Sequence, residues 1–380
     1  MAFGRGSGGN GRWRRLDATA RREQNNGLSP KPVSRSTRRT RRPQHATIRD
    51  VARAVGASIS TVSAALNGTD YVSAAMRAKI DAAVQQLQYR PNDLARGLRL
   101  RRTHTLAIVV PDLSNSFYAE IVRGMKDYTA AANYTVLVGD SRERWAEEKL
   151  FLEMLHRRRV DGVVRVPAGD GNASQAAQVL GTIPVVYADR YPEADHPVAA
   201  WVGVDNARAA MDATQYLISL GHRRIAIISG PTTTRTAAER LEGYQRALRA
   251  IGAMHKEYIR NGELDMAGGA RQAIELLTQA KPPTAIFCAN NTMTLGALEA
   301  IQQLGRACPR EISLLGFDDF AWSTLLRPRL TMVRQPAREI GMTAGRMLID
   351  TIEERTRNRA TQTLPTQLMV RDSCAPPLRP

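Results

Sequence analysis

From residue 104 to near the C-terminus, the sequence alternates short apolar runs with longer amphipathic stretches, and this alternation constrains the fold more than any other feature. The apolar runs lie at 105–110, 134–139, 160–166, 183–187, 224–229, 284–288 and 313–317. Stretches with helical periodicity separate them, at 117–132, 146–158, 206–220, 237–251, 268–280, 292–304 and 337–355. Strands that are apolar on both faces must be covered on both, so the pattern predicts parallel sheets flanked by helices, an α/β architecture.

This α/β region is longer than one sheet usually requires, so we expect two lobes, each with its own doubly wound sheet. A weak internal repeat supports the division, because HTLAIVVPD at 104–112 and HRRIAIISGP at 222–231 each open one half. In open parallel sheets, ligands bind beyond the carboxyl ends of the strands. The sequence therefore predicts a ligand crevice between the lobes.

Positive charge is concentrated at the N-terminal end. Residues 1–45 hold 12 Lys and Arg against 2 Asp and Glu, residues 46–103 hold 9 against 4, and the remaining 277 residues hold 33 against 30. A basic segment joined to a near-neutral body is typical of proteins that bind nucleic acid. Residues 1–45, rich in Arg, Gly, Ser and Pro, are expected to be a disordered extension. They either attract phosphates without sequence preference or lie upstream of the true start codon.

Within the basic region, DVARAVGASISTVSAALNG at 50–68 carries no charge from residue 54 to residue 69. Thr47 is expected to cap a helix over 48–54, Gly56 to form a turn, and Ser58 to cap a second helix that ends near Leu66. The residues expected to be buried between two helices that cross steeply are Val51, Ala52, Val55, Val62 and Leu66. This spacing predicts a helix-turn-helix, and the alternative is an ordinary helical hairpin.

In a helix-turn-helix, the second helix enters the major groove of DNA with its N-terminal residues against the base edges. Short uncharged side chains suit that position, while flanking arginines contact phosphates. Ile59, Ser60 and Ala64 are expected to point outward, and Thr61, Ser63 and Asn67 to suit backbone contacts.

Several blocks resemble the lactose/purine repressor (LacI/GalR) family of transcriptional regulators. They include TIRDVARAVGASISTVSAALNG, AIVVPDLSNSFYAEIVRGM, LGHRRIAIISGP, AERLEGYQRAL, ISLLGFDD and LRPRLTMVRQPAREIG, in the family's order over residues 46–377. The resemblance implies an all-α helix-turn-helix headpiece at 46–90, a hinge at 91–103, and at 104–380 a two-lobed, periplasmic-binding-protein-like (type I) effector domain with parallel sheets. It also implies dimerisation through that last domain.

The resemblance implies DNA contacts residue by residue. Ile59, Ser60 and Ala64 match base-reading positions. The other implied contacts of the headpiece are Thr47, Ser58, Thr61, Ser63, Asn67, Tyr71 and Ser73. Many members have Arg or His where this chain has Ala64, which cannot form a side-chain hydrogen bond. Ala64 leaves only apolar contact with a thymine methyl group, or no readout, at that base pair.

The segment RPNDLARGLR matches the family's hinge helix. The matching residues are Asn92, Ala95, Arg96, Leu98 and Arg99. The resemblance implies that Leu98 wedges between base steps in the minor groove and kinks the DNA, a cost that added contacts offset. Asp93 and Gly97 weaken an isolated helix here. The alternative is that Leu98 is a plain linker residue.

On the ligand side, the resemblance assigns contacts to seven residues: Phe117, Tyr118, Asp189, Arg240, Asn290, Asp318 and Gln335. Carboxylates, amides and a guanidinium beside an aromatic ring suit a polyol, so the implied effector is a sugar or sugar derivative. Many members have Asn-Asp where this chain has Asn290 and Asn291, and the missing carboxylate is expected to bear on ligand choice.

Other classes of protein are less consistent with the sequence. The three cysteines form no metal-binding pattern, and we expect no metal and no cofactor. No P-loop, nucleophile elbow or zinc motif is present, and only Asp189 and Asp318 resemble an acid/base pair, so we expect no enzyme. No apolar run spans a membrane and no secretory signal opens the chain, which predicts a cytoplasmic protein rather than a periplasmic sugar receptor.

Together these features predict a DNA-binding transcriptional regulator, most consistent with a repressor. Its partners would be a near-palindromic operator in double-stranded DNA, a second copy of the chain, and a small effector. The chain ends eight residues after Asp372 without a heptad tail, which favours a dimer over a tetramer. The alternatives are a non-specific DNA-binding protein that carries a sugar-receptor fold, or an enzyme acting on a sugar in the same crevice.

Overall fold

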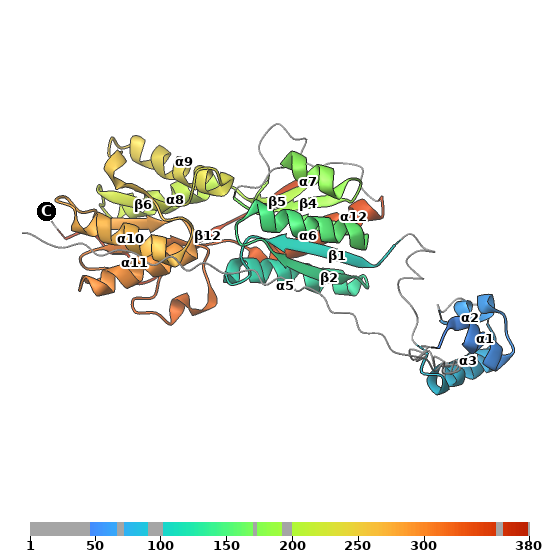
Figure 1. The fold of residues 1–380 in the computed structure, drawn as a ribbon. Helices are drawn as coiled ribbons and strands as arrows, with labels where there is room; N and C mark the ends of the chain where they lie inside the picture. Colours follow the sequence, from blue (N-terminus) through green and yellow to red (C-terminus); the bar gives the residue numbers. More distant parts are fainter. Residues whose placement is uncertain are drawn as a thin grey trace, which may run out of the picture. The chain divides into compact units, whose positions relative to one another are not determined.

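The computed structural model describes residues 46–66, 72–89, 102–169, 173–191, 200–354 and 360–378. The chain divides into two compact units, residues 1–90 and residues 91–380 (Figure 1). The sequence-based expectations for residues 1–45, for Asn67 and Tyr71, and for Asn92, Ala95, Arg96, Leu98 and Arg99 fall outside the described residues.

The first unit, hereafter the helical unit, contains α1 (Ile48–Val55), α2 (Ile59–Leu66) and α3 (Ala74–Gln86). Helix α1 begins where expected, because the Asp50 carboxylate accepts from the backbone N–H of Thr47 (2.9 Å) and from its hydroxyl (2.7 Å). Gly56 then ends α1 with φ +68°, in the left-handed region that favours glycine. The predicted helix-turn-helix is therefore confirmed.

The helical unit has a small core of its own. Its buried members are Val51, Ala52, Val62, Ala65, Ile80 and Ala83, contributed by all three helices. Val55 and Leu66, which we expected to be buried, are only partly buried at the edge of this core, and Ala65 lies within it instead. Because Ala65 precedes Leu66 by one helical step of about 100°, the buried face of α2 is rotated slightly from the expected one.

The second unit is α/β and has two lobes, each built on a six-stranded sheet. The first lobe holds β1 (Thr105–Val110), β2 (Thr135–Asp140), β3 (Gly162–Arg165), β4 (Val185–Ala188), β5 (Trp201–Val204), β11 (Thr361–Leu364), α5 (Ser116–Ala131), α6 (Trp145–Arg158), α7 (Ala173–Leu180) and α12 (Ala337–Ile352). Its sheet has the order β11-β5-β4-β3-β1-β2, and all its pairings are parallel.

The second lobe repeats this plan. It holds β6 (Ile225–Ser229), β7 (Ile259–Asn261), β8 (Ala285–Cys288), β9 (Ser313–Phe317), β10 (Thr331–Arg334), β12 (Gln367–Met369), α8 (Asn206–Ser219), α9 (Arg235–Arg249), α10 (Met266–Thr278), α11 (Asn291–Gln303) and the short 3-10 helices η1 (Lys256–Tyr258) and η2 (Ala321–Thr324). Its sheet has the order β12-β10-β9-β8-β6-β7, in which only β12 runs antiparallel to its neighbour.

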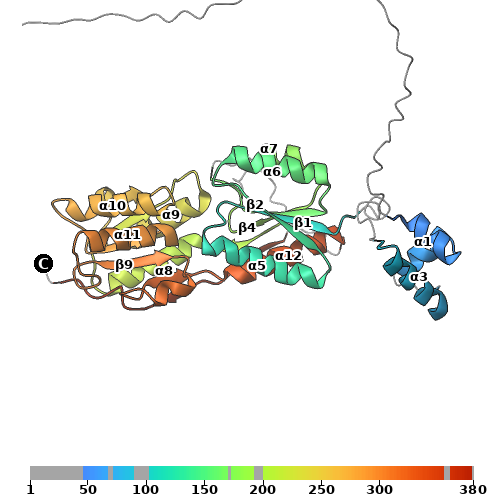
Figure 2. The ribbon, with the colours of Figure 1, turned by 60° about the horizontal axis from the view of Figure 1, so that its bottom comes forward.

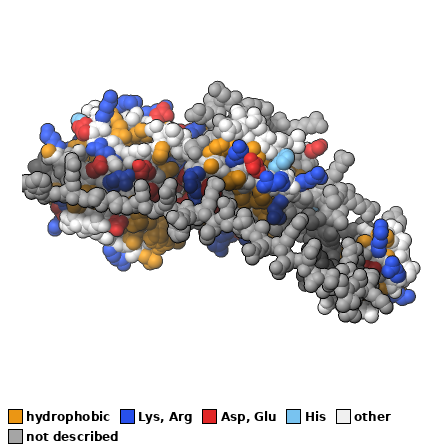
Figure 3. Space-filling model, in the orientation of Figure 1, with side chains coloured by type: hydrophobic (Ala, Val, Ile, Leu, Met, Phe, Trp, Pro, Cys, Tyr) orange, Lys and Arg blue, Asp and Glu red, His pale blue; other side chains and the backbone are white. Residues whose placement is uncertain are grey.

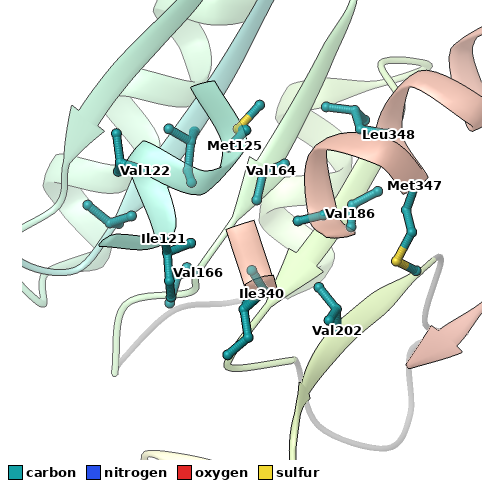
Figure 4. Packing of buried hydrophobic residues seen from close by; sticks show 14 of the residues in the cluster. Ile121, Val122, Met125, Val164, Val166, Val186, Val202, Ile340, Met347 and Leu348 are labelled. Carbon is teal, nitrogen blue, oxygen red and sulfur yellow. The ribbon is translucent and has the colours of Figure 1, made fainter. Parts of the chain in front are cut away.

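Both faces of each sheet are covered, as the apolar strands predicted. In β1, Leu106, Ile108 and Val110 pack against α5 and α12, while Ala107 and Val109 pack against α6 and α7. Figure 2 shows these two helix pairs on opposite sides of the first sheet, and Figure 4 shows the side chains of α5, α12 and the sheet meeting in the core. In the second lobe, α10 and α11 cover one face and α8 and α9 the other.

The chain passes between the lobes three times. The connections run from β5 to α8, from β10 to α12 and from β11 to β12, and each joins elements only two or three residues apart. Short connections of this kind confine relative motion of the lobes to a few backbone angles. The carboxyl ends of β1, β4, β6, β8 and β9 consequently face the boundary between the lobes, where the ligand crevice is predicted.

Candidate functional site

A cavity of about 330 Å³ lies between the two lobes, at the carboxyl ends of their strands. Its lining comes from the segments after β1, β2 and β4 and the start of α5 in the first lobe, and from the start of α9 and the segments after β7, β8 and β9 in the second. The lining residues are Pro111, Asp112, Asn115, Phe117, Tyr118, Arg142, Glu143, Asp189, Arg190, Thr236, Ala237, Arg240, Glu263, Leu264, Asp265, Ala289, Asn290 and Asp318.

The fold brings the predicted effector residues together. Six of the seven line the cavity: Phe117, Tyr118, Asp189, Arg240, Asn290 and Asp318. Gln335 lies behind them, and its amide Nε2 donates to Asp318 Oδ1 (2.6 Å). Gln335 therefore orients a lining carboxylate rather than lining the cavity itself. That these residues contact an effector stays a prediction.

Backbone geometry directs the two predicted carboxylates into the cavity. Asp189 and Asp318 each directly follow a strand, β4 and β9, and both have positive φ, +59° and +66°. A left-handed residue at the end of a strand turns the chain sharply and costs about 1 kcal/mol or more. Phe117 and Tyr118 lie in the first turn of α5, which Asn115 caps by accepting from the Phe117 N–H (3.0 Å).

Arg240 is held from three sides. Its Nε donates to Asn206 Oδ1 (2.8 Å), its Nη1 donates to the carbonyl of Ala289 (2.6 Å), and its guanidinium lies 3.8 Å from the ring centroid of Phe317. Asp318 supplies the counter-charge, with Oδ2 3.5 Å from Nη1. Burial raises the pKa of the Asp318 carboxyl, and Arg240 opposes that rise.

A second charged group, which the sequence-based prediction missed, surrounds Arg190. Its Nη1 and Nη2 donate to the two carboxylate oxygens of Glu143 (2.7 and 2.8 Å), and Nη2 also donates to the hydroxyl of Tyr118 (2.9 Å). Asp189 lies beside this pair, 2% exposed, and its Oδ1 has no hydrogen-bond partner. Burial, opposed mainly by Arg240 and Arg190, raises the pKa of Asp189 to about 6.

Asn290 and Asn291 have structural partners. Asn290 Oδ1 caps α11 by accepting from the N–H of Met293 (2.8 Å), and its Nδ2 donates to the carbonyl of Leu264 (3.0 Å). Asn291 does not line the cavity but exchanges two hydrogen bonds with Asn115 of the first lobe, at 3.0 and 2.8 Å. The expectation that the missing carboxylate at 291 bears on ligand choice stays a prediction. The Asn291 side chain joins the lobes.

The cavity wall combines charged and aromatic side chains. Two buried arginines, four buried or half-buried carboxylates and an aromatic pair converge on one cavity. Among the described residues, no group of three or more His, Cys, Asp or Glu is placed to hold a metal ion. Nor does any helix among them have the length and apolar character needed to cross a membrane.

The predicted DNA-contacting face of α2 is exposed at its N-terminal end. Ser58 and Ser60 are exposed, Ile59 is 44% exposed, and Thr61, Ser63 and Ala64 are half-buried. The Ser58 hydroxyl caps α2 by accepting from the N–H of Thr61 (3.1 Å) and lies 2.6 Å from that of Ser60. This helix start therefore presents hydroxyl groups and one apolar side chain without charge.

Among the described residues, the two other predicted contacts of the helical unit, Thr47 and Ser73, occupy helix caps. Ser73 accepts from the N–H of Met76 (3.3 Å) at the start of α3, and Thr47 precedes α1. Figure 3 shows Lys and Arg side chains on the visible face of this unit. That basic groups contact phosphates around an uncharged base-reading helix stays a prediction.

Two cavity residues that were not predicted, Glu143 and Arg190, lie at positions that the sequence pattern identifies. Glu143 follows β2 and Arg190 follows Asp189 after β4, so both lie at the carboxyl ends of strands. Because ligands bind beyond the carboxyl ends of parallel strands, polar residues that follow any predicted strand are candidates for the site, and both residues meet this criterion. Asn115 pairs with a residue 176 positions away, and no local pattern predicts that contact.

Comparisons with known protein families match both units. Residues 47–92 match the family model described as bacterial regulatory proteins, lacI family. Residues 214–374 match the model described as periplasmic binding protein-like domain.

The chain is also similar to individual proteins along most of its length. It is 33% identical over 330 residues to the HTH-type transcriptional repressor CytR of Escherichia coli K12, covering 86% of this chain and 96% of the relative. It matches the structure of a transcriptional regulator CelR–cellobiose complex with a TM-score of 0.67 and 33% identity, covering 86% of this chain and 99% of that one. It matches the lac repressor dimer bound to operator and the anti-inducer ONPF with a TM-score of 0.79 and 27% identity, covering 87% and 100%.

Proposed function

The chain belongs to the lacI family of bacterial regulatory proteins, and we propose that it is a cytoplasmic transcriptional repressor that binds operator DNA as a homodimer. A small effector, a sugar or sugar derivative, binds in the cavity between the lobes and changes operator affinity. By linkage, operator binding changes effector affinity by the same factor, typically corresponding to about 1–3 kcal/mol.

One observation carries this proposal: a helix-turn-helix with an exposed, uncharged second helix shares a chain with a two-lobed unit whose buried polar side chains converge on a cavity. The named relatives support it, because they are regulators. The alignment with one of them, CytR, covers 96% of that relative and 86% of this chain. For the same reasons we propose that the protein is not an enzyme. Asp189 and Asp318, the pair that the sequence suggested as a possible acid and base, each lie beside an arginine.

The proposed contacts with bases are Ile59, Ser60 and Ala64 of α2, and the proposed contacts with phosphates surround them. Ile59 and Ala64 offer only apolar surface, so Ser60 is the one base-reading position with a hydrogen-bonding side chain. We therefore propose an operator half-site in which thymine methyl groups meet Ile59 and Ala64.

Selection of genomic DNA fragments by the purified full-length protein, at physiological salt, tests the proposal. Enrichment of one near-palindrome, both by the full chain and by a chain lacking residues 1–45, is expected. Enrichment without sequence preference that disappears with residues 1–45 would contradict it, and would favour a non-specific DNA-binding protein.

Replacing Leu98 with alanine is expected to remove most operator discrimination. In the proposed complex, the Leu98 side chain inserts between base steps and kinks the DNA, and the contacts that the kinked DNA makes offset the cost of unstacking. Alanine is too small to act as this wedge. Binding to the selected operator should fall towards the affinity for random DNA, while effector binding stays unchanged. Fluorescence anisotropy with both DNAs measures the ratio. Leu325→Ala, at a leucine that is 76% exposed in the α/β unit, is the matched control. Unchanged discrimination in Leu98→Ala would overturn the hinge assignment.

A further inference from the structure

We propose that Glu143 makes the cavity selective for uncharged effectors, because it occupies the guanidinium of Arg190 that would otherwise bind an anion. The inference rests on the proposed function, in which the cavity holds a small effector. It narrows that effector to a neutral polyhydroxy compound, such as a free sugar or nucleoside, and excludes sugar phosphates and sugar acids.

Nearly every donor of Arg190 already has an acceptor. A guanidinium has five N–H groups: two on each Nη and one on Nε. The Nη1 group donates to Glu143 Oε2 (2.7 Å) and to the carbonyl of Pro167 (3.2 Å), and the Nη2 group donates to Glu143 Oε1 (2.8 Å) and to Tyr118 (2.9 Å). Only Nε lacks a partner. A phosphate or carboxylate is recognised best by two parallel N–H groups, and Glu143 already fills that position.

The other buried arginine is no more available. Arg240 donates to Asn206 and to the carbonyl of Ala289, and Asp318 lies 3.5 Å from it. Around the whole cavity, six carboxylates face three arginines. The carboxylates are Asp112, Glu143, Asp189, Glu263, Asp265 and Asp318, and the arginines are Arg142, Arg190 and Arg240. Glu263 and Asp265 are exposed and Glu263 pairs with Arg271, so these two count for little. The buried pair Asp189 and Asp318 and the half-buried Glu143 still outnumber the two buried arginines, and an anionic ligand would meet this excess where repulsion is weakly screened.

The two buried polar atoms left without partners in the residues that line the cavity are one acceptor and one donor. Asp189 Oδ1 is buried and makes no hydrogen bond, and the Arg190 Nε that also lacks a partner lies 3.9 Å from Asp189 Oδ2. A ligand hydroxyl satisfies both atoms, since it donates to the carboxylate and accepts from the guanidinium. The adjacent rings of Phe117 and Tyr118 add apolar surface for the face of a sugar ring. The cavity therefore matches neutral hydroxyl groups at the position where an anion is rejected.

Glu143 is held in place by its own loop. Arg142 and Glu143 both have positive φ, +49° and +55°, which is uncommon for residues other than glycine. The Glu143 N–H donates to the carbonyl of Pro111 (3.0 Å), and its carboxylate also accepts from the N–H of Gly169 (3.0 Å). Backbone strain that is maintained by several contacts at a cavity wall is a feature of positions with a functional role.

The test replaces Glu143 with glutamine, which keeps the shape and removes the charge. Wild type and variant are screened by thermal shift against free ribose, glucose, cellobiose and cytidine, and against ribose 5-phosphate, glucose 6-phosphate and gluconate. Calorimetry then measures the dissociation constants of the compounds that shift. Wild type is expected to bind only uncharged compounds. Glu143→Gln is expected to gain at least tenfold in affinity for the anionic counterpart of the bound compound.

The control is Glu263→Gln. Glu263 also lines the cavity, but it pairs with Arg271 (3.1 Å) and does not touch Arg190. The Glu263→Gln substitution removes one negative charge from the lining, as Glu143→Gln does. An equal gain in affinity for the anionic compound in both variants would therefore overturn the specific role of Glu143. Preferential binding of a sugar phosphate or acid by wild type would overturn the charge selectivity but leave the proposed function standing. No binding of any compound by any of the three proteins would count against the proposed function itself.

Discussion

Replacement of Arg240 with alanine should abolish the effector response and leave operator binding in place. The guanidinium bridges Asn206 and the carbonyl of Ala289 and provides the counter-charge of Asp318. Its loss leaves Asp318 buried without an adjacent cation, a change that typically costs about 3–5 kcal/mol. Both the shape of the cavity and the stability of the second lobe should suffer, so effector affinity should fall at least 100-fold.

Calorimetry with the bound compound, together with anisotropy on the selected operator, separates the two activities. The helical unit has its own core, so the DNA-binding surface of Arg240→Ala should persist at a temperature where the variant is folded. Arg208→Ala is the control, because Arg208 lies exposed on α8 and pairs only with Asp212 of the same helix. An effector dissociation constant equal to that of wild type would remove Arg240 from the proposed site.

Asp189→Asn is expected to weaken effector binding about 10- to 100-fold while making the free protein more stable. A hydrogen bond to a charged acceptor contributes about 1.5–3 kcal/mol, and asparagine supplies only a neutral acceptor. The stability gain follows from the raised pKa of Asp189, about 6 against its ordinary value of 3.8. Below pH 3.8 the carboxyl is protonated in both the folded and the unfolded state and destabilises neither.

Between these two values only the unfolded state loses the proton, so the stability of the wild-type protein falls as pH rises from about 3.8 to about 6. Well above pH 6, the free energy of unfolding no longer falls. The total loss is at most about 3 kcal/mol, because a shift of one pKa unit corresponds to about 1.4 kcal/mol. Asparagine removes this loss, so Asp189→Asn should be more stable by about 1–3 kcal/mol at pH 7.5 and equal to wild type below pH 4. Chemical denaturation at both pH values measures it. A destabilised variant at pH 7.5 would contradict the assigned burial of the charge.

The same pKa gives the effector affinity a pH dependence. If the ligand hydroxyl donates to ionised Asp189, wild-type affinity should fall about tenfold between pH 7 and pH 5, because the carboxyl takes up a proton there. Asp189→Asn has no such group and should bind with little change across that range. The comparison of the two pH profiles distinguishes titration of Asp189 from a general effect of acid on the lobes.

Much of this architecture could be predicted from the sequence, and the reason differs between its parts. The helices of the helical unit followed from Thr47, Gly56 and Ser58, which act within a few residues of themselves. The strands that were found are those of four to six residues with continuous apolar side chains. β5 is an apolar strand of four residues, like β4 and β8, and was missed although its sequence resembles theirs. The other missed strands, β7, β10, β11 and β12, are three or four residues long and include polar side chains. Such strands are specified by their neighbours in the sheet.

The candidate site divides in the same way. Asp189, Arg240 and Asp318 lie in motifs that a family resemblance identifies, and the sheet topology brings them together. The sequence could not predict which charged side chains pair with one another. Glu143, for example, lies 47 positions from Arg190 and neutralises its charge. The charged residues identified in the sequence therefore predicted only that the pocket is polar. The proposed preference for uncharged ligands follows from the way these charges pair in the structure.

The strained turn that carries Glu143 has a consequence for the evolutionary history of such regulators. Its backbone is maintained by bonds that do not involve the Glu143 side chain, among them the Glu143 N–H to Pro111 and the Arg144 N–H to the carbonyl of Ser141. A point mutation in the Glu143 codon can therefore change the charge of the pocket wall without removing these backbone bonds. It also leaves the buried Arg190 without its carboxylate partner, at a cost in stability. Genes that differ at this codon would therefore encode proteins whose pocket walls carry different charges at one defined position.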